Sequence, residues 1–425
     1  MKRAHILGTL AVILIIAASS CTKKEAAHDP NTLTIWGWDP NYNVLAVNVA
    51  AEIYKRENPD VKINMVEVGT NEIQQRLITA FTARRTADLP DIVLIQDRNT
   101  EKFLATYPDA FLPVTGKVDI SQFAGFARAT SYMDGKNYGV HFGSGVTGTF
   151  IRRDIVEQAG LNVSDFNDTT WERFMELGMI VKEKTGASML STPMETDLIQ
   201  IMLQSTGALY FDENGNTNIR DNQTLKSVLE ILRGGIESGV ILMTNDWPSY
   251  LRSFNSGTTA SVIQGVWIIG SIVPETSQSG KWAVVNTPRF ANIDSVNYSS
   301  NGGSNWMVLA SSKNQDLAMD FLGKTFAGSV ELFERILPTS GAVATWLPAL
   351  ASPVYQEPQA FFGGQRIFAD FADFSDRVPP IRYGPFNSEA HNAVIRYAMD
   401  VLTGSMSVED ALNRAQSEAD FVIRQ

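Results

Sequence analysis

The stretch YGVHFGSGVTGTFIRRD, residues 138–154, holds two short runs on either side of a Gly-Ser-Gly turn. Tyr138–Phe142 and Thr147–Ile151 alternate apolar with polar or small residues, which predicts two strands. The glycines permit a sharp turn and the close approach of another group to the backbone. The charged residues after the second run predict a short helix at 155–159. We therefore expect the chain to pass here from one half of the molecule to the other.

The same stretch carries the spacing G-x-G-x-x-G at Gly143, Gly145 and Gly148. A dinucleotide fingerprint requires a helix to begin inside that loop, because the helix N-terminus holds the pyrophosphate. The third glycine instead leads into a predicted strand. We therefore expect no nucleotide here, and no other cofactor.

The segment before this turn alternates strands and helices. It predicts the order β-α-β-α-β for Leu33–Trp36, Asn43–Tyr54, Val61–Met65, Glu72–Arg84 and Asp91–Ile95. Such an order predicts a parallel, doubly wound sheet with right-handed crossovers. Ligands of these sheets lie beyond the carboxyl ends of the strands. That rule nominates Trp36, Trp38 and Asp39 after the first strand, and Asp97 and Arg98 after the third.

Composition narrows the class of function. The 425 residues are 44% hydrophobic and carry a net charge of −11, which argues against nucleic acid as a partner. The four histidines do not form a zinc motif, and the chain has no Walker loop, Cys cluster or Gly-x-Ser-x-Gly elbow. We expect no catalytic residues and no metal. Paired carboxylates drawn from distant positions keep a glycan hydrolase open as an alternative.

The N-terminus predicts export and lipidation. Lys2 and Arg3 precede an apolar run, Ile6–Ala18, which is too short to span a bilayer as a mature helix. Small residues then lead into Cys21, the single cysteine of the chain, as in a relaxed lipobox. We predict a lipoprotein signal peptide over 1–21 with the lipid on Cys21, and a flexible tether over 22–31. The mature chain is then extracytoplasmic and anchored to a bacterial membrane through its lipid alone.

Three motifs together resemble one family. Tyr-Gly-x-x-Phe-Gly-x-Gly from Tyr138, followed by a strand, Asp154 and Ala-Gly-Leu at 159–161, resembles the first hinge crossing of the bacterial extracellular solute-binding proteins. It is most similar to the maltose-binding-protein-like group, which usually carries Pro where this chain has His141. A Gly-x-Trp pattern ending at Trp267 and a Gly-Gly loop at 302–303 also match. The resemblance extends from residue 33 to residue 423.

This resemblance implies a fold. The family has a two-lobe periplasmic-binding-protein fold of type II, in which each lobe is a mostly parallel doubly wound α/β sheet. About three crossings join the lobes, and here they are expected at 138–151, Lys281–Pro288 and Pro338–Val343. The expected lobes are 32–142 with 286–336, and 143–285 with 337–425. We expect a monomer.

The resemblance also implies a ligand site. Trp267 matches the residue that stacks on sugar in the family, and Asp97 and Arg98 match a pair that contacts sugar. Glu195 matches an acidic or polar contact. With the strand-end and Gly-Gly loop positions, the candidate ligand-binding residues are Trp36, Trp38, Asp39, Asp97, Arg98, Gly145, Glu195, Trp267, Gly303, Ser304, Asn305 and Trp306. Flat aromatic faces suit the C–H face of a sugar, and planar polar groups suit its hydroxyls.

The implied function is that of a lipid-anchored receptor of an ABC importer. Such a receptor binds a mono- or oligosaccharide between its lobes and delivers it to the membrane permease by domain closure, while the ATPase is a separate protein. A receptor for a polyol phosphate, peptide or polyamine on the same fold remains an alternative. A membrane-anchored glycan hydrolase is a further one.

Overall fold

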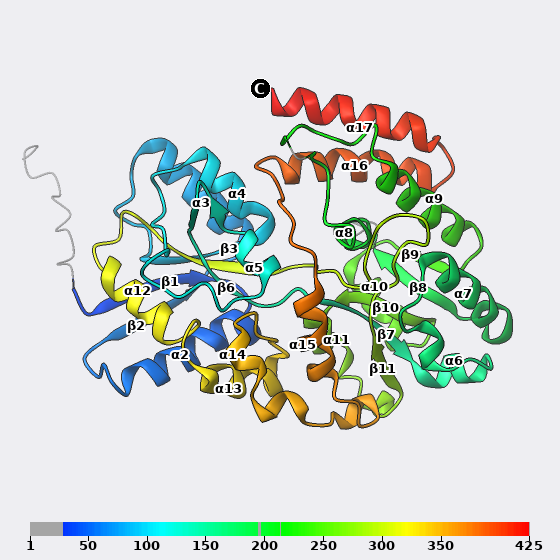
Figure 1. The fold of residues 1–425 in the computed structure, drawn as a ribbon, viewed down its shortest axis with the longest axis horizontal. Helices are drawn as coiled ribbons and strands as arrows, with labels where there is room; N and C mark the ends of the chain where they lie inside the picture. Colours follow the sequence, from blue (N-terminus) through cyan, green and yellow to red (C-terminus); the bar gives the residue numbers. More distant parts are fainter. Residues whose placement is uncertain (1–28, 194–196, 213, 425) are drawn as a thin grey trace, which may run out of the picture. The chain divides into compact units, whose positions relative to one another are not determined.

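Most strands of the protein form two five-stranded sheets within the residues that the computed structural model describes, 29–193, 197–212 and 214–424 (Figure 1). The predicted signal peptide, Cys21 and Glu195 lie outside these ranges, as does most of the predicted tether. In each sheet four strands run in one direction and one is reversed, β12 in the first and β7 in the second. Two short strands, β4 (Tyr132–Met133) and β5 (Lys136–Asn137), pair only with each other. The predicted α/β class, with mostly parallel sheets, is confirmed.

The first sheet has the order β2-β1-β3-β12-β6. Alternate residues of β1 and β3 enter different apolar clusters: Leu33 and Leu94 pack with α2, α12 and α13, whereas Trp36 and Val93 pack with α3 and α4. Helices therefore cover both faces, as expected of buried parallel strands. The elements are β1 (Thr32–Gly37), α2 (Leu45–Lys55), β2 (Lys62–Glu67), α3 (Thr70–Ala83), β3 (Ile92–Gln96), α4 (Asp97–Thr106), α5 (Gly125–Ala129), β6 (Val140–Phe142), β12 (Ser304–Val308), α12 (Gln315–Lys324), α13 (Val330–Ser340) and α14 (Leu347–Leu350).

The second sheet has the order β11-β7-β10-β8-β9. Within β7, Phe150 packs toward α15 and Ile151 toward α7, so this sheet is also covered on both faces. The elements are β7 (Thr147–Arg152), α6 (Arg153–Gln158), α7 (Trp171–Thr185), β8 (Ser188–Pro193), α8 (Asp197–Gln204), α9 (Gln223–Glu237), β9 (Ile241–Thr244), α10 (Trp247–Asn255), β10 (Thr259–Gly265), α11 (Ile269–Ile272), β11 (Trp282–Val285), α15 (Ile367–Arg377), α16 (Asn387–Leu402) and α17 (Val408–Ile423).

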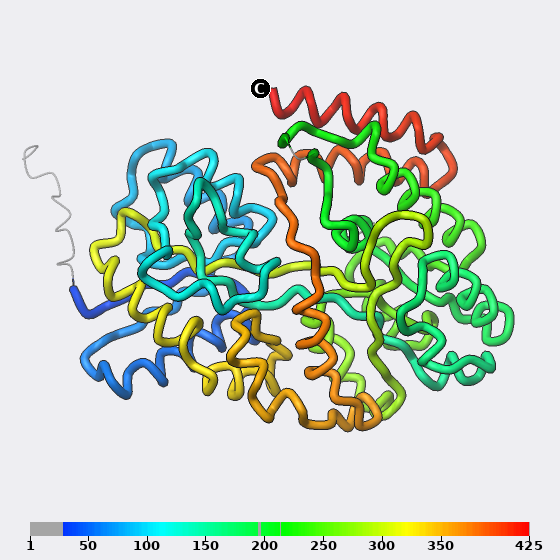
Figure 2. The backbone as a smooth tube through the Cα atoms, in the orientation of Figure 1, coloured from blue at the N-terminus to red at the C-terminus, as the bar shows by residue number. Residues whose placement is uncertain are grey.

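Two connections between the sheets run side by side (Figure 2). Residues 143–146 lead from β6 to β7, which confirms the first predicted crossing. Residues 299–303 return to β12 and pair with the first connection: the Asn301 N–H donates to the Gly145 carbonyl at 2.7 Å, and the Thr147 N–H donates to the Ser299 carbonyl at 2.9 Å. A Cβ on Gly145 would lie 2.7 Å from the Asn301 carbonyl carbon. The two backbones are thus in direct contact.

The other two predicted crossings were misplaced. The prediction for Lys281–Pro288 was wrong because Trp282–Val285 is strand β11 of the second sheet, so the return lies further along the chain. The prediction for Pro338–Val343 was wrong because Pro338 lies inside α13 and the chain then stays with the first sheet, where Trp346 pairs with Phe123. A short apolar run of this kind is expected of a buried strand as much as of a connection.

A buried polar network joins three strands of the first sheet. Asp97 is 3% exposed, and its two carboxylate oxygens contact His141 Nε2 at 2.8 Å and accept from Asn305 Nδ2 at 2.9 Å. His141 Nδ1 lies 3.0 Å from Thr345 Oγ1, and Asn305 Nδ2 also donates to Thr130 at 3.0 Å. Because both carboxylate oxygens have protein partners, Asp97 holds β3, β6 and β12 together. The expected role of Asp97 as a direct ligand contact stays a prediction, made for a side chain that is buried here.

The contact between the two connections predicts a strong dependence on glycine at position 145. Gly145→Ala places a methyl group inside the return connection and should lower the free energy of unfolding by about 1–3 kcal/mol, the scale of overpacking. Gly234→Ala is the control, since Gly234 is exposed in α9 with no atom within 4 Å of its added Cβ. That change should raise stability by about 0.5–1 kcal/mol, because Ala loses less backbone entropy than Gly. Urea unfolding measures both, and equal effects at the two sites would contradict the contact.

The network around Asp97 predicts that this carboxylate stabilises the fold. Asp97→Ala leaves buried donors of His141 and Asn305 unpaired and should cost about 2–4 kcal/mol in urea unfolding. Arg98→Ala, at the exposed neighbouring position, should change unfolding by less than about 0.5 kcal/mol. An Asp97→Ala protein as stable as the parent would contradict this role.

Candidate functional site

An aromatic cluster lies where β10 ends. Trp267, in the 3₁₀ turn Val266–Ile268, is partly buried, and its ring lies 6.0 Å from that of Trp247 at an interplanar angle of 34°. Trp247 begins α10, is 37% exposed and lies 5.1 Å from the buried ring of Tyr250. The cluster gives the second lobe an aromatic surface that is partly open. Sequence reasoning selected Trp267 and missed Trp247, although an Asp-Trp-Pro helix start marks its position.

The orientation of the Trp267 ring is fixed by the return connection. The indole N–H donates to the Asn301 carbonyl at 2.8 Å, and the Asn301 side chain donates to Gln264 Oε1 at 2.6 Å. Gln264 Nε2 lies 3.3 Å from an oxygen of Asp197, the first residue of α8. The aromatic surface is therefore bordered by carboxylate and amide groups. The sequence did not predict a role for Asn301, Gln264 or Asp197, because these residues come from three segments that are distant in sequence and meet only in the fold.

The end of β1 carries an unusual turn. Asp39 is exposed and has a positive φ of 60°, and its side chain caps the π-helix Pro40–Val44 by accepting from the Asn41 N–H at 3.0 Å. Trp38 before it is partly buried. Tyr42 packs on Phe142 of β6, and burial raises the pKa of its hydroxyl. Strained turns and π-helices concentrate at functional sites, so this turn is a candidate on geometry as well as on position.

Arg98 of the first lobe and His391 of the second lie near each other. Arg98, exposed at the start of α4, lies close enough to His391 of α16 for its charge to act on the imidazole. Burial, together with the charge of Arg98, lowers the pKa of His391 to about 4. His391 Nδ1 lies 2.8 Å from the Tyr210 hydroxyl, whose pKa is raised by burial. His391 is thus neutral at pH 7. His391 and Tyr210 were not predicted.

Helix α4 also bonds directly to the chain around the start of α16 (Figure 1). Glu101 accepts from Arg382 at 2.7 Å and from the Gly384 N–H at 2.8 Å. Lys102 forms an ion pair with Glu389, and the Ser388 hydroxyl donates to Asn99 at 3.2 Å. These bonds join elements that pack on different sheets, so they can form only when α4 and α16 are held together.

The remaining predicted site residues that the structure describes are buried, except Gly303, which is partly buried. Trp306 is fully buried between Phe142 and Phe326, and Trp36 packs in the core beneath Arg76. Ser304 and Asn305 are buried in β12, Gly145 is covered by the return connection, and Gly303 packs against Asp97. The rings of Trp306 and Trp36 have no face available for stacking in this conformation, because the side chains of both strand residues point into the core. Of the predicted set, Trp38, Asp39, Arg98, Trp267 and Gly303 retain accessible surface.

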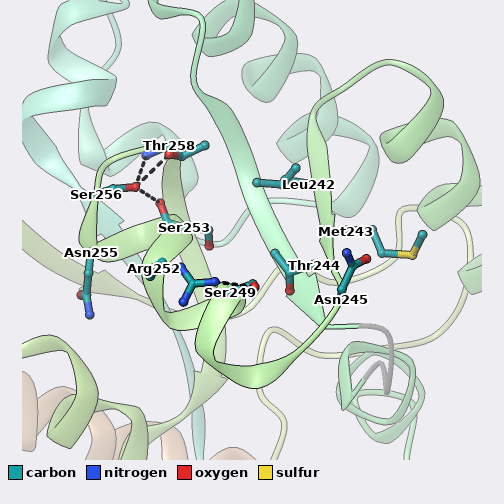
Figure 3. Close-up of a pocket in the computed structure, with 10 residues that line it drawn as sticks. All are labelled: Leu242, Met243, Thr244, Asn245, Ser249, Arg252, Ser253, Asn255, Ser256 and Thr258. Atoms are coloured by element: carbon teal, nitrogen blue, oxygen red, sulfur yellow. Dashed lines mark hydrogen bonds between the residues drawn. The ribbon is translucent and has the colours of Figure 1, made fainter.

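Two pockets of about 650 and 680 Å³ lie on the second lobe. The first lies between the end of β9, helix α10 and Thr258, and is lined mainly by hydroxyl and amide groups (Figure 3). In it Arg252 donates to Ser249 Oγ at 2.7 Å, across from Leu242 and Met243. The second adjoins β11 and Gln365. Neither is lined by a predicted site residue or offers a Trp ring, so the candidate site is the aromatic and polar surface described above.

Within the described ranges, no cluster of three or more His, Cys, Asp or Glu side chains is arranged to hold a metal ion. In the same ranges, none of the helices combines the length and apolarity needed to cross a bilayer.

The chain is similar to a family of known proteins in both sequence and fold. The model of the family described as bacterial extracellular solute-binding protein matches residues 49–363. The chain is 38% identical over 413 residues, 97% of each chain, to the lactose-binding protein of Rhizobium radiobacter. Among solved structures, the galacto-N-biose/lacto-N-biose I-binding protein of Bifidobacterium longum has a TM-score of 0.75 at 18% identity, over 94% of this chain and 98% of that one.

A further structure, the sugar-binding protein MalE of Xanthomonas citri, has a TM-score of 0.77 at 18% identity, over 92% of this chain and 97% of that one. These two structures share the two-lobe fold with this chain. The family match and the 38% identical relative carry the assignment itself: this chain belongs to the bacterial extracellular solute-binding proteins.

Proposed function

We propose that this protein is the substrate-binding receptor of an ABC importer and that its ligand is a disaccharide of the lactose type. The observation that carries the proposal is the Trp267 ring, partly open at the interlobe connection and bordered by the partly buried side chains of Asn301 and Asp197. The C–H face of a sugar stacks on such a ring, and its hydroxyls pair with planar polar groups. The lactose-binding protein at 38% identity supports this choice of ligand.

Residues of both lobes contact the sugar in this proposal. Trp267 and Trp247 supply the aromatic face from the second lobe, with Glu195 as a further contact. Arg98 and Asp39 supply polar contacts from the first lobe. A ligand held by both lobes stabilises the state in which the lobes are together, because it makes contacts there that the open state lacks. The bonds of α4 to Arg382 and to Glu389 of α16 support such a closed state.

The mechanism is domain closure without covalent chemistry. We propose that the first lobe comprises residues 32–142 with 304–346, and the second residues 148–298 with 367–424, linked at 143–147, 299–303 and 347–366. Few connections between two packed units make a hinge of low energetic cost. The closed form then docks on a separate permease, and a separate ATPase drives transport. We propose a monomer, with no catalytic activity and no cofactor.

We also propose that Cys21 is lipidated after removal of residues 1–20, so that the receptor is held on the extracytoplasmic side of a bacterial membrane. The support is the position of the single cysteine directly after the apolar run. The family to which the chain belongs is extracellular, which agrees with export.

Binding measurements distinguish the proposed ligand from its rivals. Calorimetric titration of the purified protein should show saturable binding of lactose, with at least about tenfold weaker binding of maltose, spermidine and a tripeptide, the scale of one or two lost hydrogen bonds. Lactose recovered after overnight incubation should be intact. Binding of spermidine or the peptide in preference to every sugar would overturn the ligand class, and release of galactose would establish a hydrolase.

The anchor is tested by fractionation of cells that express the full chain. Cys21→Ser should move the protein from the membrane to the soluble fraction, because a thioether-linked lipid requires the thiol. Its melting temperature should equal that of the parent protein. Ser20→Ala is the control, since it keeps a small residue before the cysteine and should leave the protein in the membrane fraction. Quantitative retention of the Cys21→Ser protein in membranes would contradict lipid anchoring at this position.

A further inference from the structure

Gln264 is buried beneath the aromatic surface formed by Trp267 and Trp247 and does not belong to that surface. It lies near the end of β10 and is 1% exposed. Its Oε1 accepts from Asn301 Nδ2 at 2.6 Å and from the Gly265 N–H at 3.0 Å, and its Nε2 faces Asp197 at 3.3 Å. The amide of Gln264 is therefore fully occupied by protein groups, and a ligand cannot reach it.

Asn301 carries the influence of Gln264 to the indole. The side chain of Asn301 bonds to Gln264, while its carbonyl accepts from Trp267 Nε1 at 2.8 Å and its N–H donates to Gly145. A Cβ on Gly265 would lie 2.3 Å from Trp267 Nε1 and 2.7 Å from the Asn301 carbonyl oxygen. The indole is thus pressed against two segments of backbone. Its orientation depends on where Gln264 holds Asn301.

We propose that Gln264 is a positioning residue for ligand recognition: through Asn301 it fixes the Trp267 ring and ties that ring to the return connection between the lobes. This inference rests on the proposed stacking of sugar on Trp267. Because Asn301 belongs to residues 299–303, a movement of this connection also moves the acceptor of the indole N–H. Gln264 therefore links the ring that meets the ligand to the segment about which the lobes move.

The second lobe contains a matched control for this arrangement. Gln278 is also buried, and its Oε1 accepts from the indole N–H of Trp282 at 2.7 Å while its Nε2 donates to the Asn255 carbonyl at 2.6 Å. Trp282 is fully buried in the core. The two pairs share their residue types, but the second has no bond to the connections between the lobes. If the buried glutamine had only a structural role, its replacement would have the same effects on stability and on binding in both pairs.

A double-mutant cycle with lactose tests the coupling. Gln264→Met keeps the volume and removes the hydrogen bonds, and Trp267→Phe keeps a stacking ring and removes the indole N–H. Each should raise the Kd for lactose roughly fivefold to tenfold, the scale of one hydrogen bond. The Kd of the double variant should be no higher than that of the single variant with the higher Kd, because both substitutions break the same chain of hydrogen bonds. Fold-changes that multiply in the double variant would overturn the proposal, as would a Gln264→Met protein with unchanged Kd.

Gln278→Met and Trp282→Phe should lower the melting temperature and leave the Kd within about twofold, the scatter of distant independent sites. Indole N–H resonances of the ligand-free protein supply a second readout. Trp267→Phe and Trp282→Phe assign the two signals by their loss. Gln264→Met should shift the Trp267 signal, and Gln278→Met the Trp282 signal. Failure of the parent protein to bind lactose would contradict the proposed ligand, whereas an unshifted Trp267 signal in Gln264→Met would overturn the positioning role.

Discussion

The contact between the two central connections constrains the rest of this protein. A chain that leaves one sheet for another must pair its backbone polar groups on the way, because unpaired buried groups are costly. Here residues 143–147 and 299–303 pair with each other, and Gly145 allows them to touch. The pairing brings β12 into the first sheet beside β3 and β6, and it brings Asn301 beneath Trp267.

The polar groups near this contact differ in their exposure to solvent. Asp97 and His141 are sealed within the first lobe, where their bonds stabilise the strands that meet the connection. Arg98, one residue on, is exposed, and its charge acts on His391 of the second lobe. Adjacent positions at the start of one helix are thus buried and exposed in turn, because successive helical residues point about 100° apart. The ion pairs of Glu101 with Arg382 and of Lys102 with Glu389 lie on the next turn of the same helix.

Sequence reasoning succeeded where the signal is local. The alternating order of strand and helix patterns over residues 33–95 predicted the parallel order of β1, β2 and β3, and the Gly-Ser-Gly turn predicted the first connection. It failed where the deciding partner is distant. Asp97 meets His141 and Asn305 across 44 and 208 residues, so a motif match could not show that its carboxylate is buried. The core position of Trp306 likewise depends on distant partners, Phe142 and Phe326. The side chain of Gln264 is connected to Trp267 through Asn301, which is also distant in sequence.

A sugar held by both lobes should draw them together about the paired connections. Small-angle scattering of the purified protein, with and without saturating lactose, measures this movement. We expect a smaller radius of gyration with lactose, reached at the concentrations at which binding saturates. Tight binding of lactose with an unchanged scattering curve would contradict this expectation, since the ligand would then occupy a pocket that already exists without closure.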